Sequence, residues 1–181
     1  VGGQLEADIE RLAKIETVLR KVKDYKVTLD GNETFQNVES LSVFVHAMTQ
    51  HEATQRLLER TLLIEQPLPR AIALEEKILT MPLNIPVILD ESDDHPDVLV
   101  KGLALGYRGI SSKACKGIYR SLHSASLVQQ TPQCLLSGED LTCQAGLGVQ
   151  QDTLLATSLG VQHIERNGHH YVKGFGIAPT H

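Results

Sequence analysis

The stretch Leu62-Leu63-Ile64-Glu65-Gln66-Pro67 decides the interpretation of the whole chain, because it is a short apolar run that ends in an acid. A continuous apolar run of this length is typical of a strand that is covered on both faces in a parallel sheet. Five more short stretches are expected to be strands and lead into a charged residue: residues 27–29 before Asp30, 86–89 before Asp90, 109–112 before Lys113, 134–137 before Gly138-Glu139-Asp140, and 161–164 before Glu165-Arg166.

Helical patterns separate these runs. Before the first run, apolar residues recur at every third position and predict a helix with one apolar face: Ile9, Leu12, Ile15 and Val18. Further helical patterns cover residues 38–63, with one or two helices, and residues 71–79, 97–105, 117–128 and 146–159. Strands that alternate with helices predict βαβ units and a parallel sheet.

The spacing of the strands is regular. They end near residues 30, 65, 90, 113, 138 and 164, so that the period after a longer first interval is about 25 residues. Eight such units make a TIM-type (β/α) barrel. Since six are visible, we expect an incomplete α/β barrel that forms one catalytic domain over residues 1–181, with the first strands outside this chain. The rival is a doubly wound open sheet, but no Gly-x-Gly-x-x-Gly follows a predicted strand.

The composition is that of an ordinary globular domain, with 41% hydrophobic and 22% charged residues and a net charge of −5. The lack of a basic field argues against binding to nucleic acid or to an anionic membrane, and no apolar stretch has the length of a membrane span. The three cysteines have no Cys-x-x-Cys spacing, which argues against structural zinc and a disulfide framework. We therefore expect a cytoplasmic protein.

Three successive predicted strands end in acids, Asp30, Glu65 and Asp90. The carboxyl ends of the strands converge at one mouth of a parallel barrel, where active sites lie. Carboxylates gathered there repel one another unless a cation lies among them, and ligation by oxygen alone suits Mg²⁺ or Mn²⁺. The next strand ends in Lys113, which can act as a base or an acid when it is partly desolvated near the metal. Alternatively, such acids cap the following helices or face solvent.

At these positions the sequence resembles the enolase superfamily. Leu29-Asp30-Gly31-Asn32 resembles the segment that carries the first metal-ligand Asp and its neighbouring Asn, and Ile64-Glu65-Gln66-Pro67-Leu68 is similar to the motif of the second ligand. Leu89-Asp90-Glu91-Ser92 resembles the third ligand motif, and Ser111-Ser112-Lys113 occupies the place of the lysine on the sixth strand. The resemblance covers nearly the whole chain and implies that the three acids bind the metal ion.

Within that superfamily the sequence is similar to the muconate-lactonizing-enzyme-like branch, because the sixth strand ends in lysine and the seventh has no histidine. The resemblance implies abstraction of the proton α to a substrate carboxylate, through an enediolate, in a racemase, epimerase, cycloisomerase or syn-dehydration reaction such as that of o-succinylbenzoate synthase. It implies that Lys113 acts on one face of the substrate, that Glu91 pairs with Lys113, and that Asn32 supports Asp30. The expected partners are a small carboxylate-containing substrate and further copies of the chain in a homo-oligomer.

The resemblance places two parts of the family plan outside this chain. One is a second catalytic lysine, in a Lys-x-Lys motif before Val1, and the other is the N-terminal capping domain. The Asp-x-Asp pattern that dipeptide epimerases carry at the eighth strand is missing, since Glu165-Arg166-Asn167 stands there. This departure argues against the dipeptide epimerase reaction.

Four polar residues near the last two strands are weaker candidates for contacts to substrate. Glu139 and Asp140 follow the seventh strand, where capping of the next helix explains them nearly as well. Arg166 and His169 follow the eighth strand, where Asn167-Gly168 also fits a plain hairpin turn.

Two other functions stay open. The chain could be a non-catalytic homologue that keeps the barrel as a binding or structural module, although the three acids and Lys113 argue against a loss of catalysis. It could also be an unrelated barrel enzyme, such as an aldolase that uses Lys113 as a Schiff base. Trapping with borohydride separates the aldolase from the enolase type, which forms no imine.

Overall fold

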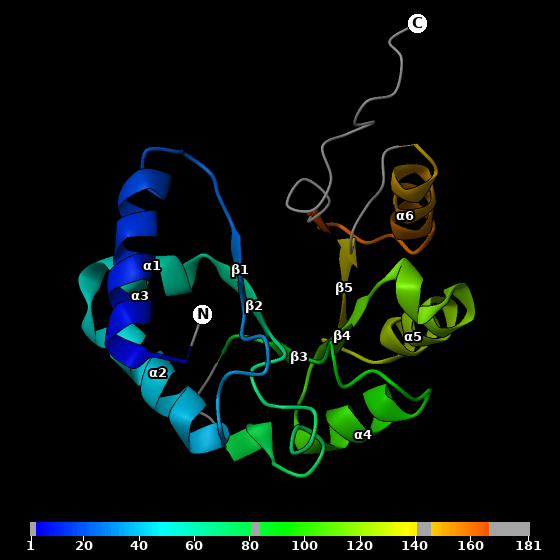
Figure 1. The fold of residues 1–181 in the computed structure, drawn as a ribbon, viewed down its shortest axis with the longest axis horizontal. Coiled ribbons are helices and arrows are strands. Elements are labelled where there is room, and N and C mark those ends of the chain that lie inside the picture. The colour runs from blue at the N-terminus through cyan, green and yellow to red at the C-terminus, as the bar shows by residue number, and fades with distance from the viewer. Residues whose placement is uncertain (1–2, 81–83, 141–145, 167–181) are drawn as a thin grey trace, which may run out of the picture. The chain divides into compact units, whose positions relative to one another are not determined.

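The computed structural model describes residues 3–80, 84–140 and 146–166 (Figure 1). The chain forms two compact units. The first comprises Val1–Ser92 and Val100–Arg108, and the second comprises Asp93–Leu99 and Gly109–His181. Helix α4 (Val98–Leu105) contributes residues to both units. None of the described helices is both long and apolar enough to cross a membrane.

The first unit contains a three-stranded parallel sheet, with the helices α1, α2 and α3 beside it (Figure 1). Its strand order is β1-β2-β3, so neighbours in the sequence are neighbours in the sheet. The elements in chain order are α1 (Leu5–Leu19), β1 (Val27–Asp30), α2 (Val38–Gln50), α3 (Glu52–Glu59), β2 (Thr61–Glu65), the 3₁₀ helix η1 (Ile78–Thr80) and β3 (Val87–Ile88).

The core of the first unit is apolar. Helix α2 starts with a capping box, in which the Asn37 side chain accepts a hydrogen bond from the Ser40 N–H at 2.8 Å. The helix then buries side chains at spacings of three and four, which keeps them on one face. Buried residues from α3, β2, the loop after β2, and β3 with the residue after it complete this core: Leu41, Phe44, Met48, Leu57, Leu63, Ile64, Leu68, Ile88 and Leu89.

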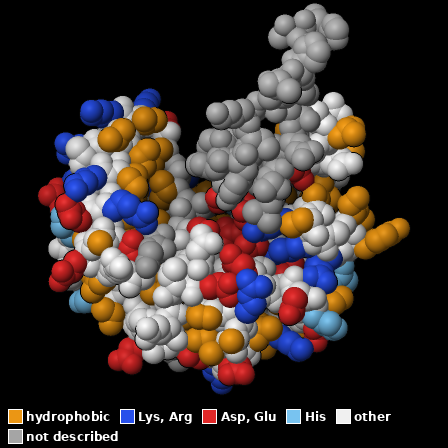
Figure 2. Space-filling model, viewed as in Figure 1, with side chains coloured by type: hydrophobic (Ala, Val, Ile, Leu, Met, Phe, Trp, Pro, Cys, Tyr) orange, Lys and Arg blue, Asp and Glu red, His pale blue; other side chains and the backbone are white. Residues whose placement is uncertain are grey.

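Helix α1 forms where predicted, but it buries a different face. Its buried residues are Asp8, Leu12 and Glu16, whereas Ile15 and Val18 are 42% and 62% exposed. A repeat of three residues drifts around a helix of 3.6 residues per turn, while the spacing of four from Leu12 to Glu16 stays on one face. Glu16 can be buried there because Arg56 of α3 donates to its carboxylate at 3.0 Å. Figure 2 shows hydrophobic side chains left at the surface over α1.

The helix predicted over residues 71–79 does not form. Residues 70–75 make turns in which the Ile72 and Ala73 N–H groups both donate to the Pro69 carbonyl, and only η1 follows. Tertiary contacts override the local pattern. The Glu76 carboxylate accepts a hydrogen bond at 2.8 Å from the N–H of Val38, the first residue of α2, and Ala73 is fully buried.

The second unit also has a three-stranded parallel sheet, in the order β4-β5-β6. Its register pairs Ser111 with Ser137 and Glu139 with Glu165. Helix α5 lies against β4 and β5. The elements are β4 (Gly109–Ser112), the 3₁₀ helix η2 (Ala114–Lys116), α5 (Ile118–Gln130), β5 (Leu135–Asp140), α6 (Leu147–Ser158) and β6 (Glu165–Arg166).

The last strand is displaced from its predicted position. The apolar run at residues 161–164 was expected to be the strand, but β6 consists of Glu165–Arg166. The run instead lies over β5, where Val161 and Ile164 occupy the space beside Gly138. The described elements thus form a mixed α/β fold with parallel strands. Closure into a complete barrel stays a prediction.

Candidate metal centre

The loops that follow β1 and β2 pack closely against each other in the first unit. The Gly31 N–H donates to the Glu65 carbonyl at 2.8 Å, and the Glu33 N–H donates to the Gln66 carbonyl at 2.9 Å, so backbone pairing continues beyond the strands. A Cβ at position 31 would stand 2.5 Å from the Pro67 Cα, which only glycine avoids. This close approach fixes where the acids at the two strand ends stand.

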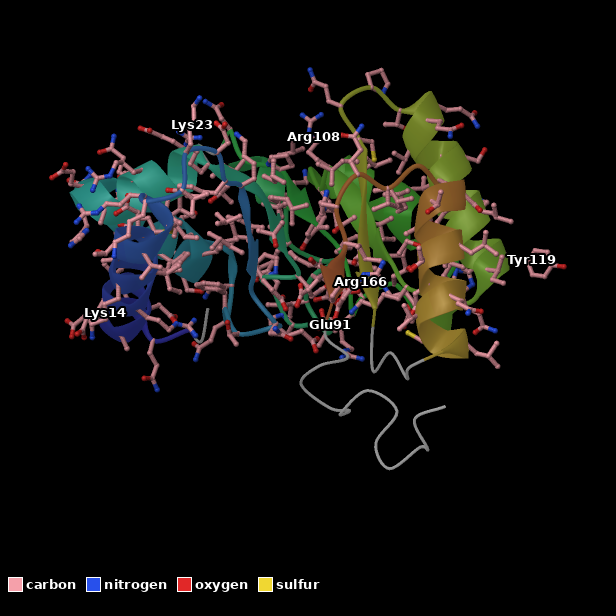
Figure 3. All side chains as sticks on the ribbon, turned by 90° about the horizontal axis from the view of Figure 1, so that it is seen from above. Lys14, Lys23, Glu91, Arg108, Tyr119 and Arg166 are labelled. Atoms are coloured by element: carbon pink, nitrogen blue, oxygen red, sulfur yellow. The ribbon has the colours of Figure 1, made fainter. Side chains whose placement is uncertain are left out.

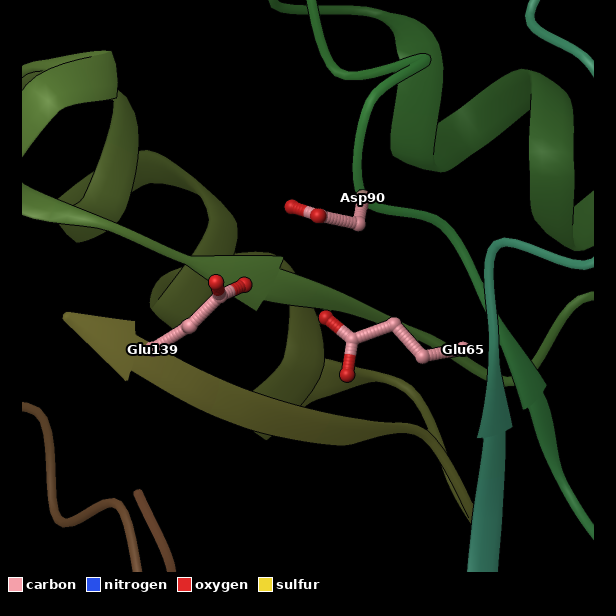
Figure 4. A group of neighbouring side chains, drawn as sticks. All are labelled: Glu65, Asp90 and Glu139. Carbon is pink, nitrogen blue, oxygen red and sulfur yellow. The ribbon is translucent and has the colours of Figure 1, made fainter. Parts of the chain in front are cut away.

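Glu65 and Asp90 bring two carboxylates together at the carboxyl ends of neighbouring strands (Figure 4). Glu65 is the last residue of β2, and Asp90 follows β3 by two residues. One oxygen of each carboxylate lies within 4.8 Å of the other. Both residues are buried, with exposed fractions of 4% and 3%. Two buried carboxylates at this separation repel strongly, and an oxygen-preferring divalent cation between them would relieve that repulsion.

Asp30 stands on the adjoining strand, as the register partner of Glu65. Its carboxylate accepts a hydrogen bond from the Asn32 N–H at 2.8 Å and another from the Asn32 side-chain amide. Asn32 can make both contacts because its backbone has a φ of 45°, a left-handed conformation that asparagine tolerates better than most residues. The structure thus gathers Glu65 and Asp90, places Asp30 next to Glu65 in the sheet, and puts Asn32 in contact with Asp30.

The donor set suits Mg²⁺ or Mn²⁺. All three predicted ligands are carboxylates at the carboxyl ends of adjacent parallel strands, and ligation by oxygen alone is what these hard cations prefer. Glu91 follows Asp90 and is half-buried. Its predicted pairing with Lys113 stays a prediction.

Gln66 is a residue of this region to which the sequence analysis gave no role. Its side chain is fully buried and contacts Leu68, Asp90 and Ser92. The sequence signal for it is its place directly after a strand-end acid, inside the motif Ile64-Glu65-Gln66-Pro67-Leu68.

In the second unit, Lys113 forms an ion pair with Glu139. The two side chains are 7% and 11% exposed. Ser112 pairs with Gly138 in the register of β4 and β5. The following residues, Lys113 directly after β4 and Glu139 of β5, therefore lie beside each other. From the sequence, Glu139 was expected only to contact the substrate. Aligning the two predicted runs does not find this pairing, because residues 109–112 and 134–137 set Lys113 against Gly138, whereas the register of the sheet is shifted by one residue.

A polar layer lies along the same sheet of the second unit. The Ser137 hydroxyl and the His163 Nε2 are 3.0 Å apart. Burial lowers the pKa of His163 below its ordinary value, because the charged ring loses hydration there. Ser111, the register partner of Ser137, is fully buried, and its Oγ has no hydrogen-bond partner among the described residues.

The remaining predicted substrate contacts follow the last two strands expected from the sequence. Asp140 is the last residue of β5, and its side chain is outside the described part of the structure. Arg166 is exposed on β6 and donates to the Thr153 hydroxyl of α6 at 3.2 Å (Figure 3). His169 lies outside the described residues.

The sequence matches no family model and no curated protein, but its fold matches solved structures. The chain is similar to the L-Ala-D/L-Glu epimerase from Bacillus subtilis, with a TM-score of 0.76, 18% identity, and coverage of 94% of this chain and 45% of that chain. It is also similar to a mandelate racemase/muconate lactonizing protein from Herpetosiphon aurantiacus, with corresponding values of 0.71, 21%, 90% and 44%. A third similar structure is the dipeptide epimerase from Methylococcus capsulatus, complexed with an Mg ion, at 0.67, 19%, 93% and 46%.

These matches establish the fold. The described elements have the architecture of mandelate racemase and muconate lactonizing enzyme-like structures, the group that the motifs around Asp30, Glu65, Asp90 and Lys113 resemble. The chain spans less than half the length of each of the three solved chains.

Proposed function

We propose that this chain is part of an enolase-superfamily enzyme of the muconate-lactonizing-enzyme-like branch, which abstracts the proton α to a substrate carboxylate. The observation that carries the proposal is the pair of buried carboxylates, Glu65 and Asp90, at neighbouring strand ends. They stand in a fold shared with racemases and epimerases, at the positions where the sequence resembles the family's metal ligands. In this proposal the barrel is closed by chain outside residues 1–181.

The metal ligands of the proposed enzyme are Asp30, Glu65 and Asp90, with Asn32 orienting Asp30. Mg²⁺ is the proposed ion, with Mn²⁺ as its substitute. Carboxylate ligation supports this choice, as does the Mg ion in the similar dipeptide epimerase. When bound, the ion supplies electrostatic stabilisation for the negative charge that develops on the enediolate oxygens.

Lys113 is the proposed acid–base group on one face of the substrate. A buried lysine with a carboxylate beside it is held in one orientation, and Glu139 supplies that carboxylate within the second unit. We propose that Glu91 also interacts with Lys113, and that a second lysine from the remainder of the barrel acts on the opposite face. The lysine that removes the proton is then set by the stereochemistry of the substrate.

The reaction class is racemisation or epimerisation, cycloisomerisation, or syn-dehydration of the o-succinylbenzoate synthase type. The proposed substrate is a small carboxylate, the proposed assembly a homo-oligomer, and the proposed compartment the cytoplasm. Glu139, Asp140, Arg166 and His169 remain candidates for contacts to the part of the substrate away from the metal.

Exchange of the α-proton tests the proposal directly. The full-length protein with Mg²⁺ is incubated in D₂O with a panel of N-acyl amino acids, dipeptides and other small carboxylates, and deuterium at the α-carbon is read by mass spectrometry. We expect exchange in the wild type and its loss, to the uncatalysed level, in Asp90→Asn, which removes a ligand charge without changing shape. The matched control is Asp94→Asn, a change at an exposed aspartate four residues away, which should leave exchange intact.

Full exchange in Asp90→Asn would overturn the ligand assignment. If the wild type binds carboxylates with Mg²⁺ but exchanges none across the panel, the result favours the non-catalytic binding module.

A further inference from the structure

The amide of Gln66 makes hydrogen bonds in every direction available to it. Its Oε1 accepts from the Asp90 N–H at 2.8 Å and from the Ser92 N–H at 3.2 Å. Its Nε2 donates to the Leu68 carbonyl at 2.8 Å and to the Ser92 hydroxyl at 2.7 Å. An amide has two acceptor lone pairs and two donor hydrogens, so the side chain is fully satisfied although it is completely buried.

These side-chain hydrogen bonds take over from the backbone hydrogen bonds between β2 and β3 at the point where the strand pairing ends. The Gln66 N–H still donates to the backbone carbonyl of Ile88 at 3.0 Å, as in a regular parallel pair. Two residues further on, the Asp90 N–H donates to the side-chain oxygen of Gln66, while the Gln66 backbone carbonyl accepts from the Glu33 N–H. The chain that carries Asp90 is thereby held at the edge of β2 beyond the last strand bond.

The Gln66 backbone is adapted to this task. Its φ of 30° lies in the left-handed region that non-glycine residues rarely adopt, and the surrounding bonds must hold it there. Through backbone and side chain together, the residue connects the loop after β1, at Glu33, with the segment after β3, at Asp90 and Ser92. Of the common side chains, only an amide of this length offers two acceptor and two donor positions here.

We propose that Gln66 is the positioning residue of the metal centre, which sets the affinity for the ion by fixing the backbone that carries Asp90. Gln66 touches neither ion nor substrate in this role. This inference rests on the proposed metal site, because it explains what keeps the carboxylates of Asp90 and Glu65 close enough to bind one ion.

Binding of Mn²⁺, read from the EPR signal of the free ion, tests the inference without any assay of activity. The full-length Gln66→Met variant keeps the volume of the side chain and loses all four hydrogen bonds. We expect its Kd for Mn²⁺ to rise about 10- to 100-fold, the usual effect of removing a group that orients a metal ligand. Measurements are made well below the lowest Tm, so that only folded protein is compared.

The matched control separates positioning from general stability. Thr54 is fully buried in α3 and donates to the Met48 carbonyl at 2.8 Å and to the His51 carbonyl at 3.1 Å, and it has no place in the proposed site. Thr54→Val therefore removes buried hydrogen bonds and should lower the Tm while leaving the Kd for Mn²⁺ unchanged. Ser92→Ala removes one of the four Gln66 bonds and should weaken Mn²⁺ binding by about 3-fold.

The outcomes distinguish the inference from the proposed function. A wild type that does not bind Mn²⁺ overturns the metal site and, with it, the proposed function. A wild type that binds Mn²⁺, with Gln66→Met equally tight, overturns only the positioning role. If Gln66→Met does not fold, Ser92→Ala decides: a weaker Kd supports the role of Gln66, and an unchanged Kd contradicts it.

Discussion

The two units of the chain bury different kinds of side chain. The first unit has an apolar interior, with Leu41, Met48 and Leu63 completely buried. In the second unit, the buried residues that the structure describes are largely polar, among them Ser121, Ser137 and Lys113, and α6 has no buried residue. Large apolar side chains of this unit are instead exposed, and Figure 3 shows Tyr119 of α5 pointing outward.

The difference shows that similar strand–helix units can be held together in two ways. Apolar burial contributes about 25 cal/mol per Å² without directional demands, whereas buried polar groups stabilise only when each finds its partner. The proposed metal ligands are therefore held by the apolar packing of the first unit, where two carboxylates must be kept close together. Lys113 is held in the second unit, where specific hydrogen bonds and ion pairs connect the buried side chains.

The largest test of this comparison truncates one leucine in each unit. Leu63→Ala opens a cavity in the fully buried core of β2 and should lower the free energy of unfolding by about 2–5 kcal/mol. Leu154→Ala, on α6 where the side chain is 68% exposed, should change it by about 0.5 kcal/mol or less. Urea unfolding of the full-length variants measures both. Equal losses would contradict the contrast between the two interiors.

Two adjacent serines of β4 test how the second unit depends on its polar partners. The Ser112 hydroxyl donates to the Ser121 hydroxyl of α5 at 2.9 Å, so Ser112→Ala should lower the free energy of unfolding by about 1 kcal/mol. Ser111→Ala removes a buried hydroxyl that has no partner among the described residues and should be neutral or slightly stabilising. The same urea titration compares them. A clear loss in Ser111→Ala would show that its Oγ is satisfied.

The smallest expected effect on stability concerns the partly exposed ion pair between Arg70 and Glu33 in the first unit. Arg70 donates to the Glu33 carboxylate at 2.7 Å and 3.0 Å, and this pairing lowers the pKa of Glu33 below its ordinary value of 4.5. A lowered pKa in the folded state means that the stabilisation is present above pH 4.5 and is lost as the pH falls through the folded-state pKa. Because Arg70 is 61% exposed, Glu33→Gln should reduce stability at pH 7 by only about 0.5 kcal/mol.

Thermal unfolding of the wild type and Glu33→Gln across the acid range checks this sign. The two Tm values should differ most near neutral pH and converge below the folded-state pKa. A gap that widens in acid would contradict the assignment.

The strand ends of both units could be predicted because they depend on short-range information. An apolar run followed by a charged residue marks the end of a buried strand, and Asp30, Glu65 and Lys113 are found where this pattern puts them. Parallel topology then orders the ends, which is why Glu65 and Asp90 could be expected to meet. Their metal chemistry stays a proposal.

The parts that sequence reasoning missed depend on long-range contacts. The buried face of α1 is decided by Arg56, some forty residues away, which makes Glu16 a buried residue. The turns at residues 70–75 and the pairing of Lys113 with Glu139 likewise depend on partners that local patterns do not reveal. The left-handed backbone of Gln66 has no sequence signature, because it is imposed by neighbours on both sides.

The contact between Gly31 and Pro67 limits how this site can be remodelled by mutation. Because a Cβ at position 31 would come within 2.5 Å of the Pro67 Cα, any larger residue there would act as a wedge between two ligand-bearing loops. A mutant library aimed at new substrates should therefore keep position 31 fixed. Diversity is better placed at Glu33 and Arg70, whose charged ends reach water and can change without spreading the loops.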